Sequence, residues 1–182
     1  MLFLMEEILV DKNTQIAILI PLTFLFLACL AMASYPMETY QIGNMKVPCD
    51  VYTSVVVWSH YYGVDKNLAL ALACQESSWN QNCKGAAGEV GVFQIMMGTV
   101  QMYNNSVPSR EVLTRYKLDD NCRLGVWYLS TKLNEFKGDQ TRAIASYNCG
   151  SSNVKYWWDI PTTRKHVTKV LVYYARLCGD NI

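Results

Sequence analysis

Apolar residues recur at helical spacing along most of the chain, and turn residues separate these segments. Leu68 and Leu72 are four residues apart, and Leu124, Tyr128 and Leu129 follow a similar spacing further on. Such patterns predict helices that each bury one face. We expect helices over residues 50–62, 65–76, about 99–103, from 119 or 120 to 133, 139–147 and 163–177. The fold class is therefore mainly α.

The N-terminal part differs, because residues 16–33 form an uncharged apolar run. Eighteen residues are just enough to cross a bilayer as a helix. The run ends in Ala-Met-Ala, which is also the pattern of a signal-peptidase site. The sequence leaves open whether residues 1–34 are a transmembrane anchor or a cleaved signal peptide. Residues 35–48 are expected to be a linker, and residues 49–182 to be one folded domain.

Glu76 is the first candidate for chemistry. Asp65 is a suitable N-cap for its helix, and Glu76 lies eight residues after Leu68, at the edge of the apolar face. Partial burial and the negative end of the helix dipole both disfavour a charged carboxylate. Glu76 is therefore expected to hold a proton and to be able to act as a general acid. Taken alone, a glutamate at a helix end is more often simply solvated, and only the motifs described below favour a catalytic role.

Charge and cysteine content narrow the function classes. Sixteen Lys and Arg residues against fifteen Asp and Glu residues give a net charge of +1, so nucleic acid is not an expected partner. Six of the seven cysteines follow the apolar run. Six cysteines in a short domain predict disulfides and an oxidising compartment such as the periplasm. Zinc is the rival, but the chain has no C-x-x-C pair.

Four segments in one order carry a more specific signal. They are Gly63-Val64-Asp65 to Gln75-Glu76-Ser77; Gly85-Ala86-Ala87-Gly88 with Gly91 to Met96; Asn121, Gly125, Tyr128 and Leu129; and Ser146 to Gly150. With them the sequence resembles the lytic transglycosylases of the soluble type (SLT) over about residues 50–170. It departs from that family at Ser146 and Cys149, where alanines are usual. Residues 161–167 also lack the glutamate and tyrosine of the family's P-x-E-T-R-x-Y-V ending.

The resemblance implies a single lysozyme-like domain, with room for one small β-hairpin near the glycine-rich loop. It implies cleavage of peptidoglycan strands between N-acetylmuramic acid and N-acetylglucosamine, leaving a 1,6-anhydro end. Ordinary glycosidases use two carboxylates. Here Glu76 would act first as acid and then as base toward the sugar's own C6 hydroxyl. No metal or organic cofactor is implied.

The resemblance also assigns roles to residues around Glu76. Tyr147 is the expected catalytic partner of Glu76, and the expected substrate-binding residues are Ser77, Gln94, Asn148 and Gly91. His60 and His166 are too isolated in the sequence to receive a role.

The implied partner is the peptidoglycan strand, with the membrane as a second partner if residues 16–33 remain uncleaved. The protein is then expected in the periplasm or cell envelope, serving wall turnover, a secretion or conjugation apparatus, or a virion. Three alternatives stay open. These are a hydrolytic lysozyme in which Glu89 matters, a non-catalytic wall-binding or scaffold protein, and a holin-like membrane protein acting through residues 16–33.

Overall fold

The computed structural model describes residues 38–107 and 112–180, which form six α-helices, one 3-10 helix and one two-stranded sheet. The prediction of a mainly helical domain is confirmed for this part of the chain. The elements are β1 (Thr39–Ile42), β2 (Met45–Pro48), α2 (Cys49–Tyr62), α3 (Lys66–Ser77), α4 (Met97–Ser106), α5 (Leu118–Glu135), α6 (Gln140–Cys149), η1 (Val154–Asp159) and α7 (Pro161–Cys178).

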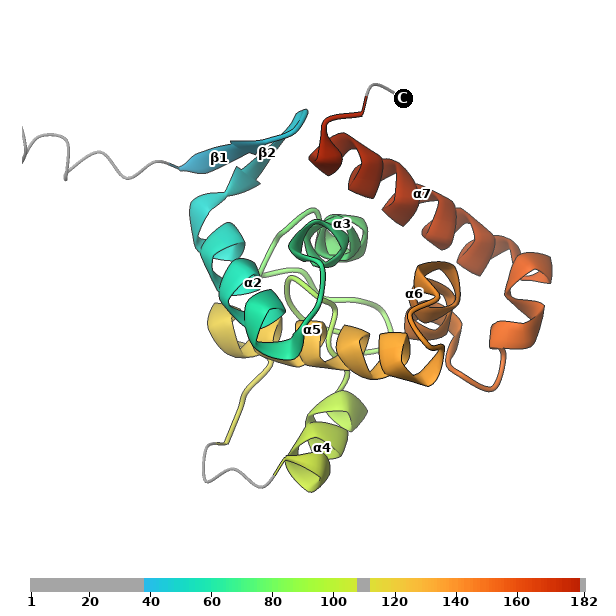
Figure 1. The fold of residues 1–182 in the computed structure, drawn as a ribbon. Helices are drawn as coiled ribbons and strands as arrows, with labels where there is room; N and C mark the ends of the chain where they lie inside the picture. Colours follow the sequence, from blue (N-terminus) through green and yellow to red (C-terminus); the bar gives the residue numbers. More distant parts are fainter. Residues whose placement is uncertain (1–37, 108–111, 181–182) are drawn as a thin grey trace, which may run out of the picture. The chain divides into compact units, whose positions relative to one another are not determined.

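Helix α3 is the centre of the fold, and α2, α5, α6 and α7 surround it (Figure 1). Seven consecutive residues of α3, from Leu68 to Cys74, are buried. The alternation of leucine and alanine explains this, because a helix that is apolar on every side is stable only in the core. The expected one-sided burial was therefore wrong for most of α3. Only the last turn of α3 reaches the surface, where Gln75, Glu76 and Ser77 are partly exposed.

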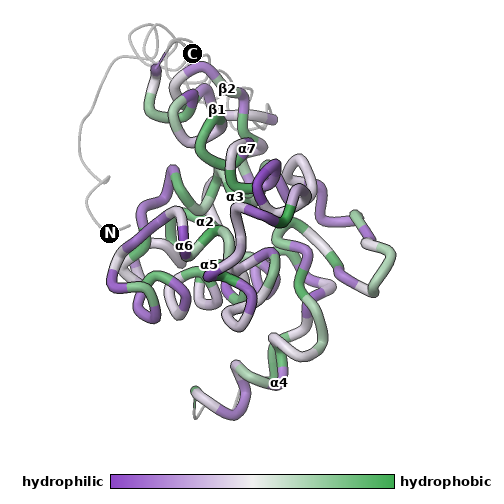
Figure 2. Tube along the Cα trace, turned by 90° about the vertical axis from the view of Figure 1, so that its right-hand side faces the viewer, coloured by the Kyte–Doolittle hydropathy of each residue, from purple (hydrophilic) through white to green (hydrophobic). Residues whose placement is uncertain are grey.

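The predicted helix ends are largely confirmed. The Asp65 carboxylate accepts hydrogen bonds from the backbone N–H groups of Asn67 and Leu68, and Asp139 caps α6 through Arg142 N–H. Gly63 ends α2 in the left-handed conformation. Helix α4 is longer than expected, and η1 has no counterpart in the sequence analysis. Helix α4 lies beyond α5, away from α7, and projects from the other helices (Figures 1 and 2).

The β-hairpin lies in the segment that was expected to be a linker. Strands β1 and β2 pair antiparallel, with Tyr40 opposite Val47. The reason is packing, since Val47 is fully buried and the Asn44 N–H donates to the carbonyl oxygen of Arg176 in α7. The glycine-rich loop, where a hairpin seemed possible, contains only isolated bridges between Lys84 and Val90 and between Val90 and Ile95.

No helix of the described residues is long and apolar enough to cross a membrane. The apolar run 16–33, on which the anchor and signal predictions depend, lies outside the described residues.

The disulfide prediction is not supported. All six cysteines after residue 38 are free thiols in the structure. Two of them, Cys74 and Cys122, are buried in the core. Burial raises the pKa of Cys74 to about 11 and raises the pKa of Cys122 further. Core packing accounts for these two residues as small apolar side chains.

Candidate active site

Glu76 lies in the last turn of α3 and lines a pocket of about 230 Å³. Its side chain is 15% exposed. The buried length of α3 fixes the backbone of this turn, so the carboxyl is held on a rigid element at the pocket wall. The pocket residues come from α3, the glycine-rich loop, α4, α5 and α6: Glu76, Gly85, Glu89, Gln94, Ile95, Met96, Thr99, Tyr128, Tyr147 and Asn148.

The hydrogen-bond partner of Glu76 is His166 in α7. Its Nε2 lies 3.0 Å from Glu76 Oε1, and its side chain is 7% exposed. Helices α3 and α7 pack against each other, which brings these residues together across 90 positions of sequence. Sequence reasoning missed His166, because no local pattern links it to a glutamate 90 residues earlier in the chain.

Asn121 in α5 holds the glycine-rich loop. It is fully buried, and its Nδ2 donates to the carbonyl oxygens of Val90 and Arg115, each at 2.8 Å. Its Oδ1 accepts from Phe93 N–H at 2.9 Å. Gly91 has φ +84°, and a side chain there would overlap the Asn121 amide. Glycine is therefore required at residue 91 for conformation and for space.

Gly125 makes room for Phe93 one turn further along α5. A Cβ atom at residue 125 would overlap the Phe93 ring. Phe93 is itself fully buried. The spacing of these α5 residues therefore has a physical reason. Asn121 binds the backbone of the glycine-rich loop, Gly125 leaves space for the Phe93 ring, and Tyr128 lines the pocket.

Ser77 and Gln94 are held by the backbone of the same loop. Ser77 Oγ donates to the carbonyl oxygen of Val92 at 2.8 Å and accepts from Asn80 N–H. Gln94 has a left-handed φ of +48°, and its Nε2 donates to the carbonyl oxygen of Gly91 at 2.8 Å. Gln94 lines the pocket with Glu76, whereas Ser77 joins the helix end to the loop.

Tyr147 lies beside Glu76 but is bonded elsewhere. Its hydroxyl donates to the carbonyl oxygen of Phe93 at 3.0 Å, and its ring packs edge-to-face on Tyr128 with centroids 5.0 Å apart. Burial, followed by the charge of Glu76, raises the pKa of Tyr147 well above its usual value. The phenol is therefore neutral at any physiological pH.

Asn148 follows Tyr147 at the end of α6 and is exposed. Its Oδ1 accepts from Thr163 Oγ1 at 2.8 Å, which joins α6 to the start of α7. Because the oxygen is used in this bond, the amide nitrogen of Asn148 points away from Thr163. Asn148 also lines the pocket.

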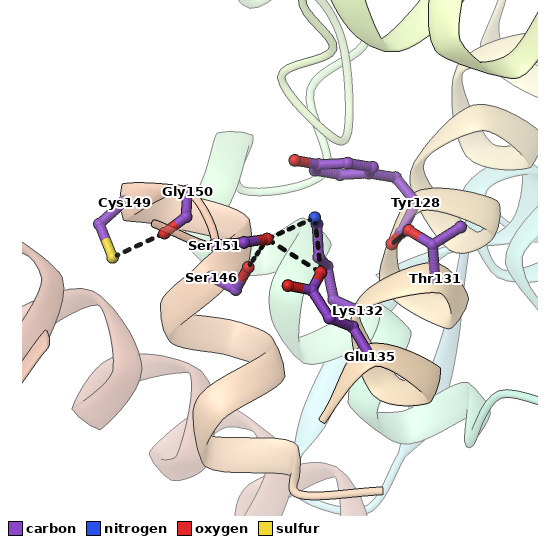
Figure 3. Close-up of polar contacts among 8 residues, drawn as sticks. All are labelled: Tyr128, Thr131, Lys132, Glu135, Ser146, Cys149, Gly150 and Ser151. Atoms are coloured by element: carbon purple, nitrogen blue, oxygen red, sulfur yellow. Dashed lines mark hydrogen bonds and ion pairs between the residues drawn. The ribbon is translucent and has the colours of Figure 1, made fainter. Parts of the chain in front are cut away.

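A polar network joins α5 to α6 and the turn that follows it (Figure 3). Lys132 Nζ donates to Ser151 Oγ at 2.8 Å and to Glu135 Oε2 at 3.1 Å, and it lies 4.9 Å from the centroid of the Tyr128 ring. Ser146 Oγ is 3.0 Å from Ser151 Oγ. Hydrogen bonds from Ser151 and Lys132 lower the pKa of Glu135. Ser146, a departure from the family pattern, thus has a partner in this chain.

Glu89 is a second carboxylate at the pocket. Its side chain is only partly exposed and lines the pocket with Glu76. Its Oε2 accepts from Ala87 N–H at 2.9 Å, which closes the turn of the glycine-rich loop.

The structure therefore brings four predicted residues, Glu76, Gln94, Tyr147 and Asn148, to one pocket. Ser77 and Gly91 lie behind its wall rather than in its lining. His166, to which no role was given, is the residue hydrogen-bonded to Glu76.

A helical domain with Glu76 in the last turn of a buried helix and Glu89 in the loop at the same pocket is the arrangement of a lysozyme-like enzyme. The model of the Transglycosylase SLT domain matches residues 54–168, and the chain belongs to this family.

Two relatives show how far the similarity extends. The soluble lytic murein transglycosylase of Escherichia coli K12 is 31% identical over 141 residues, which cover 64% of this chain and 22% of that protein. The soluble lytic murein transglycosylase of Salmonella typhimurium is 33% identical over 99 residues, covering 52% of this chain and 15% of that protein. This chain thus spans less than a quarter of the relatives it matches.

Solved structures agree with this assignment. The 70 kDa soluble lytic transglycosylase of Escherichia coli superposes with a TM-score of 0.64 at 26% identity, covering 70% of this chain and 24% of that one. An inactive glutamate-to-glutamine mutant of the lytic transglycosylase Slt of Pseudomonas aeruginosa gives a TM-score of 0.62 at 25% identity, with coverage of 71% and 24%.

Proposed function

We propose that this protein is a peptidoglycan lytic transglycosylase, which cleaves the β-1,4 bond from N-acetylmuramic acid to N-acetylglucosamine. The observation that carries the proposal is Glu76, a carboxyl 15% exposed at the pocket wall with one oxygen hydrogen-bonded to His166. Family membership supports the same reaction. In the Pseudomonas aeruginosa relative, a glutamate-to-glutamine mutant is inactive, which is consistent with an essential glutamate in that protein.

The proposed reaction uses Glu76 twice. The protonated carboxyl first gives its proton to the glycosidic oxygen as the bond from C1 to that oxygen breaks. The resulting carboxylate then takes the proton of the sugar's C6 hydroxyl as O6 bonds to C1. The attacking group is part of the substrate, so no water has to be positioned, and the intramolecular reaction has a high effective concentration.

The other pocket residues are proposed to position the sugar. Gln94 Nε2 is occupied by the loop carbonyls, so its oxygen is left for an N-acetyl N–H group. Asn148 offers its amide nitrogen, since its oxygen is bonded to Thr163. Neutral Tyr147 keeps the Phe93 carbonyl and the wall beside Glu76 in place. Ser77 and Gly91 would act through the loop that they stabilise rather than by touching the substrate.

Hydrolysis is the second candidate, because Glu89 lines the same pocket as Glu76. In a lysozyme, a second carboxylate activates water or attacks the sugar. The Oε2 atom of Glu89 is already used by Ala87 N–H, which favours a structural role for this residue.

Mass spectrometry of digested murein distinguishes the two reactions. We expect muropeptides with 1,6-anhydro ends, and reducing ends alone would refute the transglycosylase proposal. Glu76→Gln keeps an acceptor for His166 but removes the acid, so turnover should fall by about a thousandfold. Glu89→Gln keeps the acceptor for Ala87 N–H and is the matched control, expected to retain activity. If Glu89→Gln is as inactive as Glu76→Gln, hydrolysis is favoured.

Peptidoglycan as substrate suggests action in the periplasm or cell envelope. Disulfides would have supported an oxidising compartment, but the cysteines of the structure are free thiols. The proposed location therefore depends on the substrate and on the apolar run 16–33. N-terminal sequencing of the mature protein would separate an anchor from a signal cleaved after Ala33. A role in an envelope-spanning secretion apparatus or a virion is an extension of the same proposal.

A further inference from the structure

His166 and Glu76 form a pair that the reaction scheme above does not use. The pair joins α7 to the last turn of α3, with 3.0 Å between Nε2 and Oε1. Among the described residues, no other hydrogen bond to the Glu76 carboxyl is present. The nearby Tyr147 hydroxyl donates to the carbonyl oxygen of Phe93 instead. His166 is therefore the side chain that determines how the carboxyl is oriented.

The second nitrogen of His166 reveals the state of the ring. Nδ1 is buried and has no hydrogen-bond partner among the described residues. A buried N–H group without an acceptor is strongly disfavoured. The proton of a neutral imidazole therefore belongs on Nε2. A charged imidazolium, which carries a proton on both nitrogens, would leave the Nδ1–H unsatisfied.

This tautomer has a consequence for the two oxygens of Glu76. The Nε2–H donates to Oε1, which accepts either as a carboxylate oxygen or as the carbonyl oxygen of the protonated acid. The acidic proton cannot occupy Oε1 without displacing this bond. It must be on Oε2, which has no hydrogen-bond partner from the described residues, in a side chain that lines the pocket.

We propose that His166 is a positioning residue, which in its neutral Nε2–H form holds Oε1 of Glu76 and reserves Oε2 for the substrate. This inference rests on the proposed transglycosylase reaction. In that reaction the proton leaves Oε2 for the leaving oxygen and is replaced by the proton of the C6 hydroxyl. The Nε2–H stays in place throughout and stabilises the carboxylate formed between the two steps.

The tautomer is measured directly by NMR. The chain has only two histidines, so protein labelled with ¹⁵N-histidine gives two sets of ring signals. His60 is exposed on α2 and serves as the internal reference. At pH 8 we expect one ring, absent from the spectrum of His166→Gln, to be in the neutral Nε2–H form. An Nδ1–H tautomer or an imidazolium at that pH would overturn the inference.

Kinetics test the consequence for Glu76. His166→Leu fills similar space without a donor, and His166→Gln restores an N–H donor without a titratable ring. In His166→Leu we expect kcat to fall by about a hundredfold, the scale for losing one preorganised hydrogen bond to a developing charge, with little change in KM. His166→Gln should recover most of this loss. Equal losses in both variants, with thermal melting unchanged, would refute the positioning role.

The two proposals fail separately. If the digest contains only reducing ends, the transglycosylase reaction is wrong, while the NMR result still reports on the pair. If 1,6-anhydro ends form and Glu76→Gln is inactive, but the ring is an Nδ1–H tautomer, the inference about His166 alone is wrong.

Discussion

Asn121→Ala is the substitution that most directly tests how the pocket is built. Asn121 is fully buried and makes three hydrogen bonds to backbone groups. Two go to Val90 and Phe93 of the glycine-rich loop, at 2.8 and 2.9 Å, and one goes to Arg115 just before α5, at 2.8 Å. Each is worth about 1 kcal/mol net, so the free energy of unfolding should fall by about 3 kcal/mol. For a domain of this size the corresponding decrease in Tm is about 10 °C.

Urea unfolding followed by circular dichroism measures this loss. Asn134→Ala is the matched control, because Asn134 lies on the same helix with an exposed side chain. It should leave stability nearly unchanged. If Asn121→Ala stays within about 0.5 kcal/mol of wild type, the buried hydrogen bonds do not hold the loop as described. Activity gives a second readout. At urea concentrations well below the unfolding midpoint, the turnover of Asn121→Ala should still be lower than that of wild type. The reason is that the loop also supplies the Phe93 carbonyl oxygen that accepts from the Tyr147 hydroxyl.

Three further predictions concern packing and protonation. Gly125→Ala should destabilise by about 1–3 kcal/mol through overlap with Phe93, measured by the same unfolding experiment, and a neutral result would contradict that steric account. In native protein at pH 8, mass spectrometry after alkylation should find exposed Cys178 modified much faster than buried Cys122, whose pKa is raised by burial. Equal rates, or six thiols protected by disulfides, would contradict the structure. Because the pKa of Tyr147 is raised in the folded state, the unfolded chain ionises first, and stability should decrease above about pH 10 by up to about 1.4 kcal/mol per pH unit for this group. Tyr147→Phe should reduce that slope, and an unchanged slope would contradict the assigned burial.

Local sequence rules were sufficient for three helix ends and for placing Glu76 at the end of its helix. Asp65, Asp139 and Gly63 act through backbone groups within a few residues, so their effects are readable from the order of residues alone. The motif around Glu76 likewise lies in one segment. The hairpin was missed because its stability comes from contacts made far away in the chain, such as Asn44 with Arg176.

The cysteines show what amino-acid composition alone cannot predict. Their even number indicated pairing, but pairing depends on whether two Cβ atoms come close enough in the fold. The structure instead buries Cys74 and Cys122 in the core as free thiols.

By itself, the sequence determined the helical domain, the family and the identity of Glu76, since these depend on periodicity and on short motifs. The tertiary structure decided which side chains surround that carboxyl. Packing of α7 on α3 placed His166 against Glu76, although 90 residues separate them, and gave the Tyr147 hydroxyl to Phe93 instead. Hydrogen bonds are satisfied by whichever groups the fold brings within 3 Å or so, and no local pattern specifies those neighbours.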